Sequence, residues 1–208
     1  GSAITAIGYQ ALEDNTTGSN STAVGYQTLS NNTTGTNNTA VGATALDANT
    51  TGNHNAGFGY AALGATTTGT GNTGVGTFSL DANTTGGYNT GLGYGSLGAN
   101  VNGLQNTGIG AFALDANTSG SNNTAVGYES LTTVTTAQNN TAIGHSSLKA
   151  NTSGSTNAAV GSGALSLNTT GSQNAAFGYN SLGSNTTASN NTAVGRHALG
   201  ENTTGASN

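Results

Sequence analysis

Three aspartates each begin a short series of oxygen-bearing side chains that is typical of the start of a calcium loop. Asp47, Asp81 and Asp115 open the pattern D-A-N-T-[TS]-G, which supplies oxygens at positions one, three and five and glycine at position six. A calcium loop also needs a carboxylate at position twelve, but an apolar residue occupies that position in all three series. With one carboxylate per loop, we expect Asx turns, in which the side chain bonds its own backbone, rather than calcium sites.

The other matches to chemical motifs are isolated. Residues 69–74 fit G-x-G-x-x-G, but we expect no helix after them to present its N-terminus to a pyrophosphate. Residues 146–149 fit S-x-x-K without the supporting motifs of an acyl enzyme. His54, His145 and His197 have no second histidine or carboxylate cluster nearby in the sequence to complete a metal site. We therefore predict no catalytic residue, no cofactor, no metal ion and no enzymatic activity.

The composition excludes several classes of partner. The 208 residues contain Lys+Arg 2 and Asp+Glu 7, so only 4% are charged and the net charge is −5. Two cations cannot neutralise a nucleic-acid backbone or form a polybasic patch for anionic lipid. No apolar stretch approaches the roughly 20 residues that span a bilayer. We expect neither a nucleic-acid partner nor membrane insertion by this segment.

A repeat with a period of seventeen fills the chain. Glycines preceded by a small and then an apolar residue recur at this spacing from Gly8 to Gly195, twelve times without insertion. The unit runs from Ile4 to Ser207 with the approximate pattern N-T-A-V-G-Y-x-A-L-x-x-N-T-T-G-x-N; each repeat is named a coil here, and its positions are columns one to seventeen. Such a period predicts one repetitive domain over residues 4–207. We interpret residues 1–3 as an N-terminal remnant or tag scar, and residue 208 as the C-terminal end.

Two columns carry the large apolar side chains. Column four is always large and apolar, and column nine is leucine in every coil. Because alternate residues of a strand share a face, we expect columns two and four on one face, with column four in the core. Column three is only Ala or Gly, which indicates a closely approaching backbone. The predicted core includes Val24, Leu29, Val41, Leu46, Phe58, Leu63, Val75, Leu80, Ile109, Leu114, Val126 and Leu131.

Glycines divide each coil into segments. Column five is always glycine, and column fifteen is glycine in ten of the twelve coils. We expect positive φ at both columns. Two short strands per coil follow, one through columns two to four and one through columns six to ten, with N-T-T-G as the turn. The predicted turn glycines include Gly25, Gly35, Gly42 and Gly52.

Stacked coils explain both the repeat and the scarcity of charge. The abundance of Gly, Asn and Thr disfavours helix, so the sequence predicts an all-β fold, a parallel β-solenoid of twelve coils with a period of seventeen. Coils stacked about 4.8 Å apart would form a rod of roughly 55 to 60 Å. Like charges repeated at that spacing would repel by about 1 kcal/mol even in water, whereas stacked Asn and Thr are neutral and can bond along the axis.

The thin core and the recurring aromatic residues suggest partners. Two large apolar side chains per coil offset little of the conformational entropy lost when the whole coil is ordered, so we expect a homo-oligomer. Aromatic residues recur in column six, and Phe78 and Phe112 follow in column seven. If exposed, they are candidates for a platform that binds sugars or a receptor; the preferred alternative is that they cover the sheet edge or pack between chains. The column-six surface candidates are Tyr26, Tyr60, Tyr94, Tyr128 and Tyr179.

The repeat resembles a known family. Residues 121–131 (S-N-N-T-A-V-G-Y-E-S-L) and 36–46 (T-N-N-T-A-V-G-A-T-A-L) resemble the head repeats of trimeric autotransporter adhesins of the YadA type. They are more similar still to the N-T-A-I-G-Y-x-A-L repeats of bacterial surface proteins and phage tail fibres. The resemblance covers residues 4–207, although the autotransporter repeat is usually shorter than the repeat in this chain. It implies a left-handed β-roll, three chains about a common axis, and an adhesive fibre.

Three hypotheses about function follow. The first is an extracellular, cell-surface or virion fibre segment, homotrimeric, that presents a stiff polar rod to a host-surface glycan or protein receptor. The second is an ice-binding solenoid with Thr and Asn ladders, which ranks lower because columns thirteen and fourteen lie in a turn and column two is predicted to point with the core. The third is the subunit of a self-assembling extracellular filament.

Overall fold

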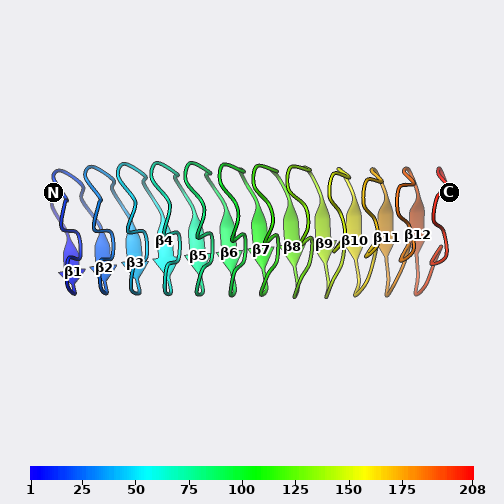
Figure 1. Cartoon of the computed structure of the whole chain (residues 1–208), viewed down its shortest axis with the longest axis horizontal. Helices are drawn as coiled ribbons and strands as arrows, with labels where there is room; N and C mark the ends of the chain where they lie inside the picture. Colours follow the sequence, from blue (N-terminus) through cyan, green and yellow to red (C-terminus); the bar gives the residue numbers. More distant parts are fainter.

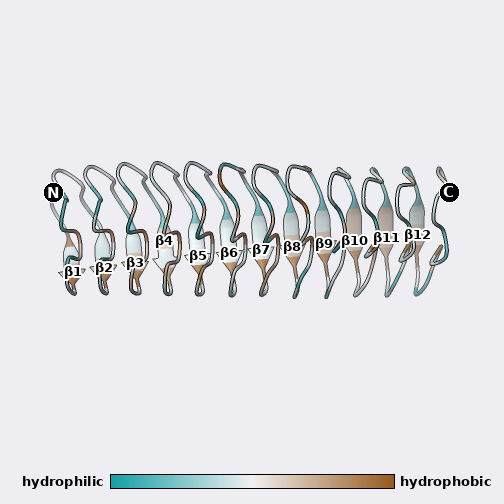
Figure 2. Ribbon diagram, in the orientation of Figure 1, coloured by the Kyte–Doolittle hydropathy of each residue, from teal (hydrophilic) through white to brown (hydrophobic).

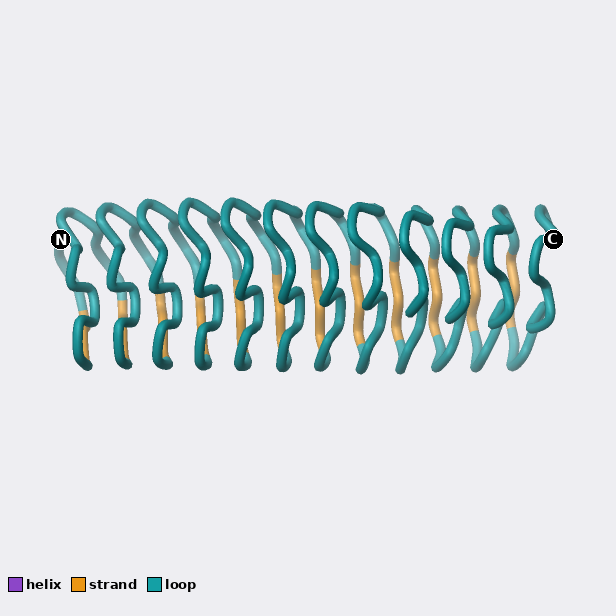
Figure 3. The backbone as a smooth tube through the Cα atoms, in the orientation of Figure 1, coloured by secondary structure: helices purple, strands orange, loops and turns teal.

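The computed structural model describes residues 1–208 and contains twelve short strands. Each strand covers columns two to four of one coil, and the strands form a single sheet in chain order (Figures 1 and 3). No helix has the length and apolar character required to cross a bilayer. The strands are β1 (Thr5–Ile7), β2 (Thr22–Val24), β3 (Thr39–Val41), β4 (Ala56–Phe58), β5 (Thr73–Val75), β6 (Thr90–Leu92), β7 (Thr107–Ile109), β8 (Thr124–Val126), β9 (Thr141–Ile143), β10 (Ala158–Val160), β11 (Ala175–Phe177) and β12 (Thr192–Val194).

Neighbouring strands are parallel and pair column by column. Ala23 of β2 lies beside Ala40 of β3, and the same one-coil register holds along the sheet. The Asn20 N–H donates to the Ser2 carbonyl at 2.9 Å and the Thr192 N–H to the Asn208 carbonyl at 2.8 Å, so residues 1–3 and 208 join the same stack. The prediction of an all-β parallel β-solenoid is confirmed.

The predicted second strand, through columns six to ten, does not form. These columns make turns, and the column-nine leucines have φ between 49° and 58° in every coil. A left-handed conformation costs a residue with a side chain about 1–2 kcal/mol. Stacking offsets this cost, because the Leu29 N–H donates to the Ala45 carbonyl of the next coil at 3.1 Å and the Leu29 side chain is fully buried.

The two faces of the sheet are the reverse of the prediction. Column three points inward: a side-chain carbon on Gly57 would lie 3.5 Å from Leu46 Cδ1, and Ala23 and Ala40 are fully buried. The interior therefore has room for one large apolar column, and the leucines fill it. Columns two and four point outward on these short strands, and the apolar ends of the strands line up along the rod (Figure 2).

The expectation that column four belongs to the core is therefore wrong for six of the predicted core residues. The leucines in column nine from Leu29 to Leu182 are fully buried. In column four, Val41 and Phe58 are 36% and 40% exposed. The other four lie half-buried on the same outer face, and they are Val24, Val75, Ile109 and Val126.

Two columns of buried asparagines complete the interior. In column one, the Asn55 N–H donates to Asn38 Oδ1 at 2.9 Å, and Asn55 Nδ2 donates to the Gly69 carbonyl at 2.8 Å. In column twelve, Asn49 Nδ2 donates to Asn32 Oδ1 at 2.7 Å. Buried polar groups are costly unless they are bonded, and these ladders bond each amide to the neighbouring coil, which favours one stacking register.

Glycine occupies columns five and fifteen for different physical reasons. Gly25 and Gly42 in column five have φ of 143° and 132°, a region that side chains disfavour. Gly35 and Gly52 in column fifteen do not have positive φ, so that prediction is wrong. A side-chain carbon on Gly35 would instead collide with Asn32 Oδ1 and with the backbone carbonyl of the next coil. In the coils that have glycine in column fifteen, Cβ would crowd the asparagine ladder and the next coil, whereas alanine occupies this column in two coils, at Ala137 and Ala188.

Candidate functional site

The surface carries no pocket and no group of three or more His, Asp or Glu side chains that could hold a metal ion. Asp47, Asp81 and Asp115 lie half-buried in column ten of alternate coils. Burial raises the pKa of all three carboxyl groups above the ordinary value of 3.8, and the Asp81 charge raises the pKa of Asp47 further. The candidates for function are therefore open surfaces.

The first surface is the outer sheet face, defined as columns two and four of β1 to β12. Nine of the twelve strands begin with threonine, and all end with a large apolar residue. Near the middle of the rod, Leu92 is 45% exposed. No charged residue occurs in any strand. This face is thus a regular threonine row beside an apolar row, and nothing in the chain covers it.

The second surface is an aromatic strip, defined as Tyr60, Phe78, Tyr94, Phe112 and Tyr128. Successive ring centroids along the strip lie 5.4, 6.0, 5.3 and 6.3 Å apart, and every pair meets edge to face, at 74° to 84°. This is the geometry that aromatic quadrupoles favour. The three tyrosines remain 47–52% exposed, so the strip presents a continuous aromatic surface over five coils.

The two remaining sequence-predicted tyrosines lie apart from this strip. Tyr26 stacks on Tyr9 with centroids 5.5 Å apart and planes 11° apart. Tyr179 meets the His197 ring edge to face, and the Arg196 guanidinium carbon lies 5.7 Å from its centroid. The predicted tyrosine row is therefore three separate aromatic groups along the rod.

The Asp115 carboxylate borders the strip, and the sequence analysis did not connect the two. A carbon placed on Gly95 would lie 3.2 Å from Phe112 Cδ1 and 3.8 Å from Asp115 Oδ1. A carbon on Gly98 would lie 2.8 Å from the same oxygen. The sequence signal is that aspartate in column ten and phenylalanine in column seven share alternate coils, but their proximity depends on the left-handed turn between them.

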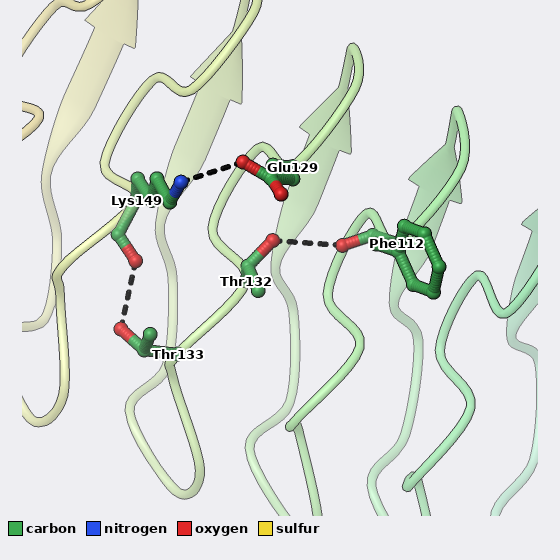
Figure 4. Close-up of polar contacts among 5 residues, drawn as sticks. All are labelled: Phe112, Glu129, Thr132, Thr133 and Lys149. Carbon is green, nitrogen blue, oxygen red and sulfur yellow. Dashed lines mark hydrogen bonds and ion pairs between the residues drawn. The ribbon is translucent and has the colours of Figure 1, made fainter.

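The eighth coil interrupts the regular pattern beside the end of the strip. Val134 replaces the column-twelve asparagine and leaves Asn117 Oδ1 without a partner. Lys149 Nζ lies 2.6 Å from Glu129 Oε2, and Thr133 Oγ1 donates to the Lys149 carbonyl at 2.7 Å (Figure 4). The hydrogen bond from Lys149 lowers the pKa of Glu129, and the bond to Glu129 raises the pKa of Lys149.

Thr132 occupies column ten of the eighth coil, where several other coils carry Asp or Gly. Its Oγ1 donates to the Phe112 carbonyl of the seventh coil at 2.8 Å (Figure 4). His54 is exposed, and His145 stacks on Tyr128 with centroids 5.7 Å apart. The interactions that these residues make are ring stacking and hydrogen bonding.

Comparisons of the chain with protein-family models, curated proteins and solved structures found no match.

Proposed function

We propose that this chain is a structural and adhesive segment of an extracellular or virion fibre, which assembles with copies of itself through the outer sheet face. The observation that carries this proposal is the apolar row of column four, half-buried to exposed on the outer face, which continues through all twelve strands without a charge. Monomeric proteins rarely expose contiguous apolar patches above a few hundred Å². A row that extends along the whole rod fits burial against an equally long partner.

A second copy of the same chain is the partner whose length and spacing match this row. Coils about 4.8 Å apart on one rod can pack against coils at the same spacing on another rod without loss of register. Rotation about an axis along the rods keeps all chains pointing the same way, and three chains are the number that the resemblance to trimeric adhesin repeats implies. The assembled rod would be stiff, with its turns facing outward for attachment.

Sedimentation equilibrium tests this assembly. We expect a mass near three times the 20.0 kDa of one chain. Val75→Glu combined with Val126→Glu places charges in column four of two coils and should yield single chains. The matched control, Thr85→Glu with Thr136→Glu, changes exposed residues of the same two coils away from the sheet and should remain trimeric. Wild-type protein that sediments as a single chain at high concentration would overturn the proposal.

Ice binding is the second candidate, because the structure places the column-two threonines on the outer face rather than toward the core. The strand threonines lie in register on adjacent strands, as Thr90 and Thr107 do, beside the apolar row. A flat array of hydroxyls and methyl groups with constant spacing can order water in a lattice. Phe58 and Phe177 project larger rings into this array, which favours the fibre function. Thermal hysteresis in wild type that Thr90→Lys abolishes would instead support ice binding.

A further inference from the structure

The aromatic strip repeats every two coils. Tyr60, Tyr94 and Tyr128 occupy column six of alternate coils, while Phe78 and Phe112 occupy column seven of the coils between them. At about 4.8 Å per coil, successive tyrosines are about 10 Å apart along the rod. The strip is therefore a continuous track along the rod with a repeat twice that of the fold.

The rings of this track are held in place while much of each tyrosine stays open. Edge-to-face contacts on both sides fix Tyr94 between Phe78 and Phe112, with centroids 6.0 and 5.3 Å away. Tyr94 nevertheless remains 50% exposed. A ligand that stacks on Tyr94 thus meets a ring whose orientation is already ordered, which lowers the entropic cost of binding.

Hydrogen-bond acceptors line one edge of the same track. Asp81 and Asp115 share coils with Phe78 and Phe112. The Phe112 ring lies against Gly95, where even one side-chain carbon would be 3.2 Å from Phe112 Cδ1, and Asp115 Oδ1 lies 3.8 Å from the same point. A ligand that contacts the outer part of the Phe112 ring is therefore close to the Asp115 carboxylate.

We propose that the aromatic strip binds a linear, neutral, β-linked polysaccharide laid along the rod. The C–H-rich face of a pyranose is complementary to the negative face of an aromatic ring, and its hydroxyls can donate to the aspartates. Successive units of a β-1,4-linked chain turn over, so that such a chain repeats every two sugars, as the strip repeats every two coils. The absence of a pocket fits recognition along a chain rather than of its end. The inference rests on the proposed adhesive function, for which it names the ligand class.

Two other classes of ligand fit the strip less well. A globular protein has no translational repeat to match that of Tyr60, Tyr94 and Tyr128. A quaternary ammonium ion could contact aromatic rings and carboxylates, but a single ion would use one step of the track and leave its repeat without a role. The strip lies in the turns after each strand, outside the outer sheet face, so assembly through that face does not require the strip as a contact.

Retention on insoluble polysaccharides tests the inference with the full chain. The probes are cellulose and chitin, which are extended β-1,4-linked chains, and insoluble amylose, whose α-linked chain winds into a helix and cannot lie extended along the strip. We expect retention on at least one β-linked polymer and none on amylose. Tyr94→Ala should weaken this retention about tenfold, as loss of one stacking ring typically does, and the Tyr60→Ala, Tyr94→Ala, Tyr128→Ala triple variant should abolish it.

Tyr88→Ala is the matched control, because Tyr88 is 68% exposed and lies outside the strip. It should be retained like wild type, and an unchanged unfolding midpoint should show that each variant is folded. If the triple variant unfolds, Tyr94→Ala together with Asp81→Asn supplies the test, with weakened retention expected.

Equal retention of wild type and Tyr94→Ala, or retention only on a quaternary ammonium resin, would overturn the inference. If the protein is trimeric but does not bind β-linked polymers, the polysaccharide inference is wrong and the fibre proposal stands. If the protein is a single chain that binds these polymers, the trimeric assembly is wrong and the polysaccharide inference stands.

Discussion

Columns four and nine each hold a large apolar side chain in every coil, yet column nine points into the interior of the solenoid and column four points outward from the sheet. In the sixth coil, Leu92 of column four is 45% exposed, whereas Leu97 of column nine is fully buried. The difference comes from their neighbours: column three is small and lets the buried leucine approach the sheet, and column four shares the outer face with threonine. The protein therefore has an apolar row for its own core and a second one available to a partner.

Truncation of the two leucines should separate these roles most strongly. Leu97→Ala should lower the free energy of unfolding by about 2–5 kcal/mol, because it leaves a cavity in a closely packed interior. Leu92→Ala removes the same atoms from a half-open surface and should cost the single chain less than ~1 kcal/mol. Denaturant unfolding at low protein concentration measures both changes. Equal losses would mean that the two rows are not on different sides.

The polar part of the interior should be the next most sensitive. Asn89 Oδ1 accepts from the Asn106 N–H at 2.9 Å, and Asn89 Nδ2 donates to the Gly103 carbonyl at 2.8 Å. Asn89→Ala should lower the free energy of unfolding by about 1–3 kcal/mol, because it leaves buried partners unbonded. Asn102→Ala, at an exposed position of the same coil, is the control and should be nearly neutral in the same denaturant titration.

Repair of a gap in the ladder should have a smaller, stabilising effect. Thr66 interrupts column twelve in the fourth coil, and Asn49 Oδ1 has no partner there. Thr66→Asn would supply a donor for that oxygen and should raise the free energy of unfolding by about 1 kcal/mol. Thr68→Asn, on the exposed side of the same turn, should change it little. A destabilised Thr66→Asn variant would show that the ladder tolerates no asparagine at this coil.

The smallest expected effect concerns the half-buried carboxylates. Because burial raises the pKa of Asp81 above 3.8, the folded state binds more protons than the unfolded state between these pKa values. Folding stability from this group therefore rises as the pH falls through its raised pKa, and the gain is complete below the ordinary value. Asp81→Asn should be more stable than wild type near pH 7, by ~0.5 kcal/mol or less. A difference in unfolding midpoint that persists unchanged below that pKa would contradict this explanation.

The period predicts most of the fold but not the direction of each side chain. Twelve uninterrupted repeats establish parallel, in-register stacking, and a leucine in every coil marks the core. The left-handed φ of Leu97, 54°, has no local signal, because isolated leucine disfavours it and only stacking with other coils stabilises it. Without that turn, the pattern predicts a strand through column nine and places column four beside it in the core. The asparagine ladders are predictable for the same reason as the leucine column: identical columns must lie over one another.

For the candidate site too, the sequence predicts the residue types of the aromatic strip but not their arrangement. Its tyrosines and phenylalanines are visible in the sequence, but they lie in different columns, and only the turn brings both columns into one row of rings. The proximity of Asp115 to Phe112 likewise depends on two left-handed residues, Phe112 itself and Leu114. Sequence patterns indicate the residue types, and backbone conformation decides which of them meet.

The uniform contact between coils has a consequence for how such a chain changes over generations. Most coils offer their neighbours the same backbone amides and carbonyls, so removal or gain of a whole unit would preserve the backbone bonding across the new junction. Unequal exchange between these near-identical segments would alter reach in steps of about 4.8 Å while the cross-section stays constant. The length of such a solenoid can therefore change by whole coils while its cross-section stays the same.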